Sequence, residues 1–349
     1  MRFFLSCILM LIGLFPFFSF ANDNVVNVYT WSQEIPHSVI KQFQTETGIK
    51  VNYTAFDSNE AMYAKLRTNK HIGYDVIEPS SYYIDRMRQE GMLEKLDKTK
   101  LPNFVHLDPF FTNLSYDPHS QYSIPYIWGV TGIFINKNYF SAEKLSQVNH
   151  WSTFLDKNYV NQLMLLDDAR EVFSMALRML GYSVNDSNPA HIKEAYLKLK
   201  ELISNVRLFN TDAVISILID EDAYIGMAWN GDLFKASLEN PNLAFVYPKE
   251  GFEIWIDNFA IVKQAPHLEN AYKFLNFMLR PDIAKIVSMS INYSTANLAA
   301  LNLMPSAIKN NDILYPPHQL LLKGEVQKDI GKQASSLFEN YWEQLKMEG

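Results

Sequence analysis

Two pairs of side chains in this sequence could hold a positively charged ligand, and the first is Trp255 with Asp257. They lie in YPKEGFEIWIDNFAIVK, residues 247–263, where aromatic and β-branched residues after a Pro-Lys-Glu-Gly turn predict a strand. Side chains at i and i+2 of a strand point the same way, so the two would share one face. An indole ring attracts an organic cation, and a neighbouring carboxylate adds a charge-assisted hydrogen bond. In isolation such a pair is more commonly core and surface, so other residues must complete the site.

The second pair is Asp168 and Glu171, directly after a predicted strand at 162–167. Their i, i+3 spacing makes them neighbours at the start of a helix, from which both carboxylates could face a ligand. The same spacing is that of a capping box, and spacing alone favours capping. An acid/base pair of a glycosidase is a third possibility, although adjacent positions on one helical turn are poorly placed to flank a scissile bond.

Aromatic residues recur at the predicted ends of strands in both halves of the chain. They are Trp31, Tyr82, Trp229, Trp255 and Tyr293. Each alone is more commonly a core residue. Together with the three carboxylates they would form a box of rings and acids. The rings would pack on methylene groups and the carboxylates would hold ammonium groups, so the box suits a flexible polycation.

The elements that would position these residues alternate between strand and helix in the first third of the chain. The predicted strands are 24–30, 49–56 and 74–80. The predicted helices are 36–47 and 82–91, and a third helix begins after a capping box at Asp57 to Glu60. This alternation predicts a parallel sheet, whose ligands bind at the carboxyl ends of its strands. The residues at those ends are 31–34, 57–59 and 80–82.

A second lobe repeats the alternation. The aromatic run 122–140 predicts the first passage into it, and 252–263 the return. Its predicted elements are strands at 162–168, 223–230 and 243–248 and helices at 169–181 and 191–203; helices at 269–280 and 332–347 follow the return. Two lobes joined by more than one crossing make a cleft above a hinge, with Trp255 and Asp257 at its floor.

The composition restricts the class of protein. A chain of 349 residues indicates two domains. Residues 1–21 combine Arg2, an apolar run and a Ser-Phe-Ala exit, the pattern of a cleavable signal peptide, with an uncleaved membrane anchor as the alternative. The only cysteine, Cys7, lies in this segment, so the remaining chain has no disulfide or thiol chemistry. That remainder has 30 Lys and Arg against 38 Asp and Glu, which does not favour nucleic-acid binding.

Motifs for other chemistry are missing from the sequence. It contains no P-loop, no dinucleotide-binding glycine motif, no H-E-x-x-H and no G-x-S-x-G. The eight histidines are scattered without the spacing of metal ligands. The sequence therefore predicts neither a metal site nor a cofactor.

Eight stretches, in the same order along the chain, carry a resemblance to a known family. They are ETGIKV (46–51), NEAMYAKL (59–66), EGMLEKLDKTKL (90–101), YSIPYIWG (122–129), DDAREVF (167–173), YPKEG (247–251), FLNFMLRPDIAK (274–285) and NLAA (297–300). The chain resembles the periplasmic spermidine/putrescine-binding proteins of bacterial polyamine ABC transporters. The resemblance implies an α/β, two-lobed periplasmic-binding-protein type II fold with two discontinuous domains, a hinge and a central ligand cleft. It implies lobes of 22–128 plus 257–300 and of 129–256 plus 301–349, behind a signal peptide at 1–21.

The resemblance also implies a set of ligand residues, carried over position by position. They are Trp31, Ser32, Gln33, Ser80, Tyr82, Asp168, Glu171, Trp229, Trp255, Asp257, Tyr293 and Gln327. The family's spermidine binder has Thr-Glu-Tyr after the first tryptophan, where this chain has Ser32-Gln33-Glu34. Gln33 thus replaces a carboxylate and Glu34 an aromatic wall. Alternation would point Glu34 away from the ligand unless the loop rearranges.

The resulting hypothesis is an exported, monomeric, non-enzymatic binding protein of the periplasm that delivers spermidine or putrescine to an inner-membrane ABC permease. Asp168, Glu171 and Asp257 would neutralise ammonium groups. A polyamine sensor that signals to a membrane receptor is an alternative, and a hydrolase that uses Asp168 and Glu171 is another. A different small ligand, such as an amino acid, a sugar or a chelated metal, also suits this fold. A shortage of cleft Lys and Arg argues against anions.

Overall fold

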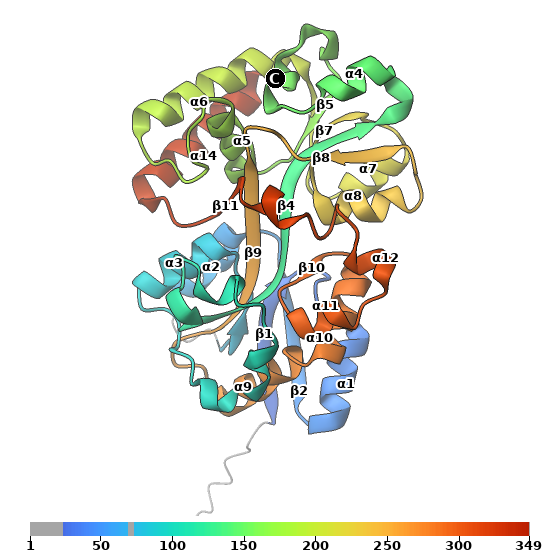
Figure 1. The fold of residues 1–349 in the computed structure, drawn as a ribbon. Coiled ribbons are helices and arrows are strands. Elements are labelled where there is room, and N and C mark those ends of the chain that lie inside the picture. Colours follow the sequence, from blue (N-terminus) through green and yellow to red (C-terminus); the bar gives the residue numbers. More distant parts are fainter. Residues whose placement is uncertain (1–23, 69–72, 349) are drawn as a thin grey trace, which may run out of the picture.

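The computed structural model of the chain describes residues 24–68 and 73–348. Figure 1 shows two lobes joined by two long strands, β4 (Ser123–Asn136) and β9 (Phe252–Ile261). The residues of β4 and β9 are buried along their whole length, which explains their nearly continuous aromatic and β-branched sequences. The structure thus has the mixed α/β, two-lobed architecture that the sequence predicts.

The first lobe is built on a sheet in the order β2-β1-β3-β9-β4. Its first strands, β1 (Val25–Trp31), β2 (Lys50–Phe56) and β3 (Val76–Ile77), pair in parallel, whereas β9 pairs antiparallel with β3 and with β4. Its helices are α1 (His37–Thr47), α2 (Asn59–Thr68), α3 (Ser81–Gln89), α9 (Leu268–Met278), α10 (Pro281–Ile291) and α11 (Leu298–Asn302). The parallel pairing brings the ends of β1, β2 and β3 to one edge of the sheet.

The second lobe continues from the far half of β4, which pairs with β7 (Ile225–Trp229) and β8 (Leu243–Val246). Parallel pairing then adds β5 (Leu163–Leu165) and β6 (Val206–Phe209). Its helices are α4 (Ala142–Gln147), α5 (Ala169–Met179), α6 (Pro189–Leu202), α7 (Val214–Ile219), α8 (Asn230–Ser237) and α14 (Gly331–Glu348). Short elements complete the chain: β10 (Ser294–Thr295), β11 (Gly324–Val326), α12 (Ser306–Lys309) and α13 (His318–Leu321).

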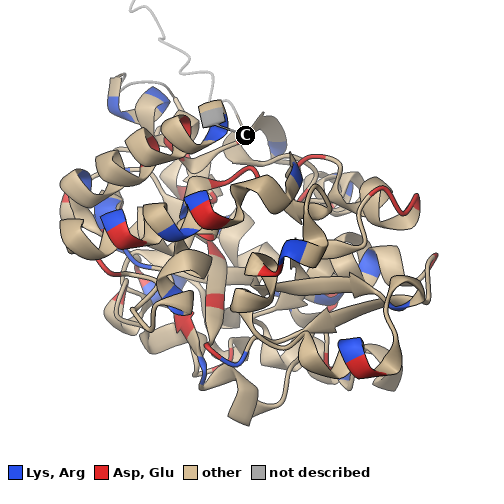
Figure 2. Cartoon of the chain, turned by 90° about the horizontal axis from the view of Figure 1, so that it is seen from above, with Lys and Arg blue, Asp and Glu red and all other residues tan. Residues whose placement is uncertain are grey.

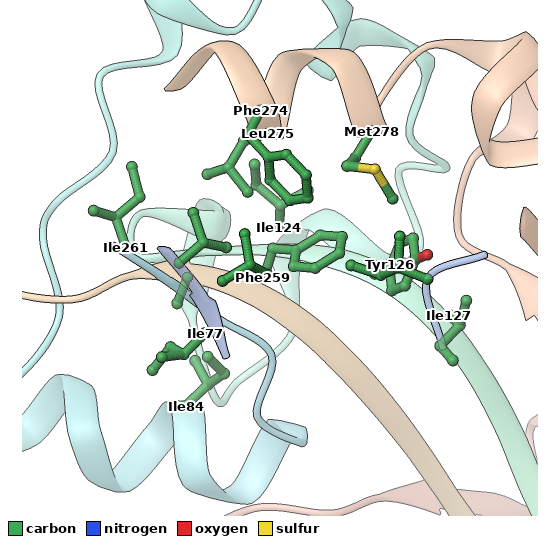
Figure 3. Close-up of a cluster of buried hydrophobic side chains, with 14 of the residues drawn as sticks. Ile77, Ile84, Ile124, Tyr126, Ile127, Phe259, Ile261, Phe274, Leu275 and Met278 are labelled. Carbon is green, nitrogen blue, oxygen red and sulfur yellow. The ribbon is translucent and has the colours of Figure 1, made fainter. Parts of the chain in front are cut away.

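Each lobe has its own hydrophobic core. In the first, Phe259 of β9 packs near Phe274 of α9, together with Ile77 and Ile84, as Figure 3 shows. The core of the second lobe includes the stacked rings of Phe173 and Phe338. Burial of one such ring contributes about 1.5–3 kcal/mol. Since each core contains many buried hydrophobic side chains, each can stabilise its own lobe. Along β4, Val130 belongs to the first core and Ile133 to the second, so the strand changes lobe between them.

Most predicted elements are present, and one difference lies near the cleft. The capping residue of α2 is Ser58, whose hydroxyl accepts the Ala61 N–H at 3.1 Å, and not Asp57. The prediction for Asp57 was therefore wrong, and its carboxylate is left beside the cleft. The elements that were not predicted are β6, β10, β11, α4, α7, α10, α11, α12 and α13. The division into lobes at residues 128/129 and 256/257 stays a prediction.

The predicted signal peptide, residues 1–21, lies outside the described residues. Within residues 24–68 and 73–348, none of the helices combines the length and the apolarity that a membrane crossing requires.

Candidate ligand-binding site

A cavity of about 370 Å³ lies between the lobes, where the parallel strands of both sheets end. Its lining is Trp31, Glu34, Asp57, Ser58, Asn59, Glu60, Ser80, Tyr82, Asp167, Asp168, Ala169, Arg170, Glu171, Thr211, Trp229, Trp255, Asp257, Tyr293, Gln327 and Glu339. Eight of these residues are acidic and only Arg170 is cationic. In Figure 2 the blue Lys and Arg segments lie mainly on outer helices and loops, whereas red Asp and Glu segments also occur on a central strand. The cavity is therefore suited to a cation.

Ten of the twelve predicted ligand residues line this cavity, and they come from both lobes. They are Trp31, Ser80, Tyr82, Asp168, Glu171, Trp229, Trp255, Asp257, Tyr293 and Gln327. The structure does not bring Ser32 and Gln33 to the cavity, because both are exposed on the loop after β1.

The loop after β1 departs from the alternation of a strand. Gln33 has a left-handed backbone with φ of 65°, so the chain turns and Glu34, not Gln33, lines the cavity. Strict alternation would direct Glu34 elsewhere, and the turn at Gln33 is the loop rearrangement that brings it to the cavity. The carboxylate that Gln33 lacks is thus supplied by the next residue.

Asp257 lies at the cavity floor and is part of a chain of hydrogen bonds. The Ser80 hydroxyl donates to its Oδ1 at 2.5 Å. The Asn59 amide donates to the Ser80 hydroxyl at 3.0 Å and to the Tyr82 hydroxyl at 3.1 Å. Burial raises the pKa of Asp257 to about 7, against the opposing effects of Ser80 and Trp31. A bound cation would stabilise the charged form of this buried carboxylate strongly, because no other positive charge within residues 24–68 and 73–348 compensates it.

The ring of Trp255 is positioned by its neighbours. It lies directly opposite Gly129 of β4, and a side chain at Gly129 would collide with the indole. Tyr293 meets the indole edge-on at 5.2 Å between ring centroids. The Tyr293 hydroxyl donates to Asp232 of α8 at 2.6 Å, so this contact links the two lobes. The predicted shared face of Trp255 and Asp257 is confirmed, since both side chains line the cavity.

The second lobe supplies the other carboxylates. Asp168 caps α5, because its Oδ1 accepts the Glu171 N–H at 3.1 Å, as the spacing predicted. Both carboxylates still line the cavity. Glu171 accepts the indole N–H of Trp229 at 3.0 Å, and its buried Oε2 has no hydrogen-bond donor. Burial, followed by the charges of Glu253 and Asp168, raises the pKa of Glu171 well above its ordinary value.

Sequence reasoning missed Glu253. It precedes Trp255 by two residues on β9, so the same alternation that paired Trp255 with Asp257 could have found it. It is 2% exposed, and its carboxylate accepts the Gln327 amide. Burial raises the pKa of Glu253 to about 7. Glu253 does not line the cavity itself, but it lies beside Glu171, which lines the cavity in the second lobe.

This arrangement can bind an organic cation in two ways. Rings from Trp31, Trp229, Trp255 and Tyr293 can cover apolar methylene groups and attract the positive charge. Carboxylates at the floor and at both ends can accept hydrogen bonds from ammonium groups. In the part of the chain that the structure describes, His, Asp and Glu form no group of three or more that could hold a metal ion.

Comparisons with known proteins agree with this geometry. Residues 38–315 match the family model for bacterial extracellular solute-binding proteins. The chain is 45% identical to the spermidine/putrescine-binding periplasmic protein of Salmonella typhimurium over 93% of both chains. It is 33% identical to the putrescine-binding periplasmic protein PotF of Escherichia coli over 87% of this chain and 86% of PotF.

A solved structure extends the agreement to three dimensions. The spermidine/putrescine ABC transporter substrate-binding protein PotD of Streptococcus pneumoniae superimposes with a TM-score of 0.80 at 34% identity, over 93% of this chain and 98% of PotD. The predicted two-lobed type II periplasmic-binding-protein fold is confirmed by this match. On fold and sequence alike, the chain belongs to the family of bacterial extracellular solute-binding proteins.

Proposed function

We propose that this chain is a periplasmic protein that binds a polyamine between its two lobes and delivers it, as a monomer, to an inner-membrane ABC permease. The observation that carries the proposal is the cavity itself, in which eight acidic residues and several aromatic rings surround a space of about 370 Å³. Such a space can hold a flexible chain with several ammonium groups, and it repels anions. The names of the relatives, which specify spermidine and putrescine, support the same class of ligand.

The roles of the side chains follow from their positions. Asp257 would bind an ammonium at the floor, and Asp168 and Glu171 would bind another at the second-lobe end. The indoles of Trp229 and Trp255 would cover the methylene groups between them, each contact worth roughly 0.5–2 kcal/mol once water is excluded. Tyr82, Tyr293 and Trp31 would close the box around the rest of the ligand.

The family gives no support to the enzymatic alternative. Its members bind solutes and are not enzymes, so a hydrolase that uses Asp168 and Glu171 is not favoured. Asp168 is also occupied with capping α5, which limits its freedom as a proton donor. The relatives are named as binding and transport proteins, so a sensor function is not favoured either.

Isothermal titration calorimetry on the protein without residues 1–21 tests the proposal. Spermidine, norspermidine, spermine and putrescine are the probes, and a neutral sugar and an amino acid are the controls. We expect heat of binding for at least one polyamine and none for the controls. A folded protein that binds none of the four polyamines would refute the proposal.

A further inference from the structure

We propose that Glu34 and Glu78 form an additional ammonium subsite at the first-lobe end of the cavity. In this subsite Glu34 contacts the ligand and Glu78 positions the Glu34 side chain. The subsite rests on the proposed polyamine function and specifies how this chain selects its ligand. It would favour polyamines with three amino groups over diamines. Its residues lie outside the set that the family resemblance implied.

The first step is the geometry of the pair. Glu34 lines the cavity, and its Oε2 is shielded from solvent without a hydrogen-bond donor. Glu78 follows β3, is 0% exposed, and accepts the Thr30 hydroxyl through Oε2. Its Oε1 has no donor either. The two carboxyl groups lie within hydrogen-bonding reach of each other, and no salt bridge reaches either of them within the described ranges.

Two buried carboxyl oxygens without a donor, one on each residue, are costly unless a proton or a cation joins them. Burial, then the charges of Glu78 and Asp257, raises the pKa of Glu34 well above its ordinary value. Burial raises the pKa of Glu78 to about 8. Both carboxyl groups therefore keep a proton to a higher pH than an ordinary glutamate, and an arriving ammonium can replace such a proton.

The groups that face the pair are acids and phenols. Asp257 of β9 and Asp232 of α8 add negative charge. Three phenols also lie at this end, and burial, followed by the nearby carboxylates, raises the pKa values of Tyr53, Tyr126 and Tyr293. The two carboxylates favour a cation over an anion at this end of the cavity, and the phenols, which stay neutral, do not oppose it.

The second step is the length of the ligand. Glu253 and Asp257 lie four residues apart on one face of β9, which corresponds to about 13 Å of strand. Glu171, which lies beside Glu253, lines the cavity at one end, and Asp257 lies near Glu34 at the other. Standard bond lengths and angles give an extended triamine about 10–11 Å between its terminal nitrogens, and putrescine about 6 Å. A triamine can therefore engage both ends, whereas putrescine can engage only one.

The test compares Glu34→Gln and Glu78→Gln with the unchanged protein by calorimetry at pH 7. Spermidine and putrescine are titrated in phosphate and in Tris, whose different heats of ionisation report the number of protons released. Glu239→Gln, an exposed position outside the cavity lining, is the matched control. Thermal unfolding verifies that each variant is folded, and Glu34→Asp serves as a second variant that keeps the charge at this position.

We expect Glu34→Gln to weaken spermidine binding tenfold or more, to change putrescine binding less than threefold, and to lower proton release by spermidine. Glu78→Gln should lower proton release with a smaller loss of affinity, because it acts through Glu34. Glu34→Asp should retain part of the spermidine preference. Unchanged spermidine binding and proton release in Glu34→Gln would overturn the proposed subsite but not the proposed function. An equal loss of affinity for spermidine and putrescine would do the same. An unchanged protein that binds no polyamine would overturn the proposed function together with it.

Discussion

Replacing Asp257 by Asn removes one charge from the cavity floor and keeps the shape of the side chain. The Asn carbonyl can still accept the Ser80 hydroxyl, which now donates to Asp257 at 2.5 Å. A bound ammonium would then be buried without its counter-charge, a loss of about 2–5 kcal/mol. We expect the lower part of this range, about 30- to 100-fold in Kd, because Glu34 and other acids remain to attract the same cation.

The pH dependence gives a second signature of the same residue. The pKa of Asp257 is about 7 in the ligand-free protein, and a bound ammonium would lower it. Below pH 7 the ligand must therefore displace a proton from Asp257. This group alone lowers the affinity by up to tenfold for each unit by which the pH falls. Because the group is half protonated at pH 7, the loss between pH 7 and pH 5 amounts to about 50-fold, or about 2.3 kcal/mol. Asp257→Asn should lose this component and show a shallower pH dependence.

Calorimetry with spermidine between pH 5 and pH 7 measures both effects. Aliphatic amines resemble the lysine ammonium, with a pKa near 10.4, so the ligand keeps its charge over this range. Asp220→Asn is the control, because Asp220 is exposed at the end of α7 and outside the cavity lining. Binding by Asp257→Asn within threefold of the unchanged protein, with the same pH slope, would refute the reasoning.

Three further predictions concern the support of the site and its charge. Gly129→Ala should lower the thermal stability by about 1–3 kcal/mol and weaken spermidine binding, because the added methyl group collides with Trp255; differential scanning calorimetry and titration check both. Asn59→Ala should leave the protein folded but weaken binding about tenfold, since Ser80 loses the donor that orients it; a native melting curve with unchanged affinity would contradict this. The ligand-free protein should be more stable at pH 6 than at pH 8, because an acid whose folded pKa is raised loses stability as pH rises through that pKa. Asp257 alone, with its pKa of about 7, accounts for about 1.4 kcal/mol, which melting curves of Asp257→Asn should lack.

Much of the site could be predicted because it depends on regular elements. The period of two in a strand placed Trp255 and Asp257 on one face. The rule that parallel sheets bind ligands at the carboxyl ends of strands directed attention to Trp31 and Tyr82. These rules need only the sequence, since the hydrogen bonds of a sheet fix where each side chain points.

The acidic residues that the predicted ligand set lacks depend on backbone geometry that cannot be read from the sequence. One left-handed residue, Gln33, decides that Glu34 and not its neighbour lines the cavity. A shift of the helix cap by one residue, from Asp57 to Ser58, leaves Asp57 facing the cavity. Glu78 is an acid in a buried segment, and only the tertiary structure shows that Thr30 and Glu34 surround it. Local patterns cannot reveal such partners because the contacts join distant parts of the chain.

Strand β4 has a mechanical consequence for the whole molecule. Residues up to Val130 pair with β9, and residues from Thr131 onward pair with β7, so one strand is a structural member of both sheets. Opening the cavity therefore cannot be a free rotation about a loose linker. It must bend a continuous hydrogen-bonded strand close to Gly129, where the backbone already lies against the Trp255 indole. Bending stiffness, and not only ligand contacts, then sets the angle to which the two lobes return when the cavity is empty.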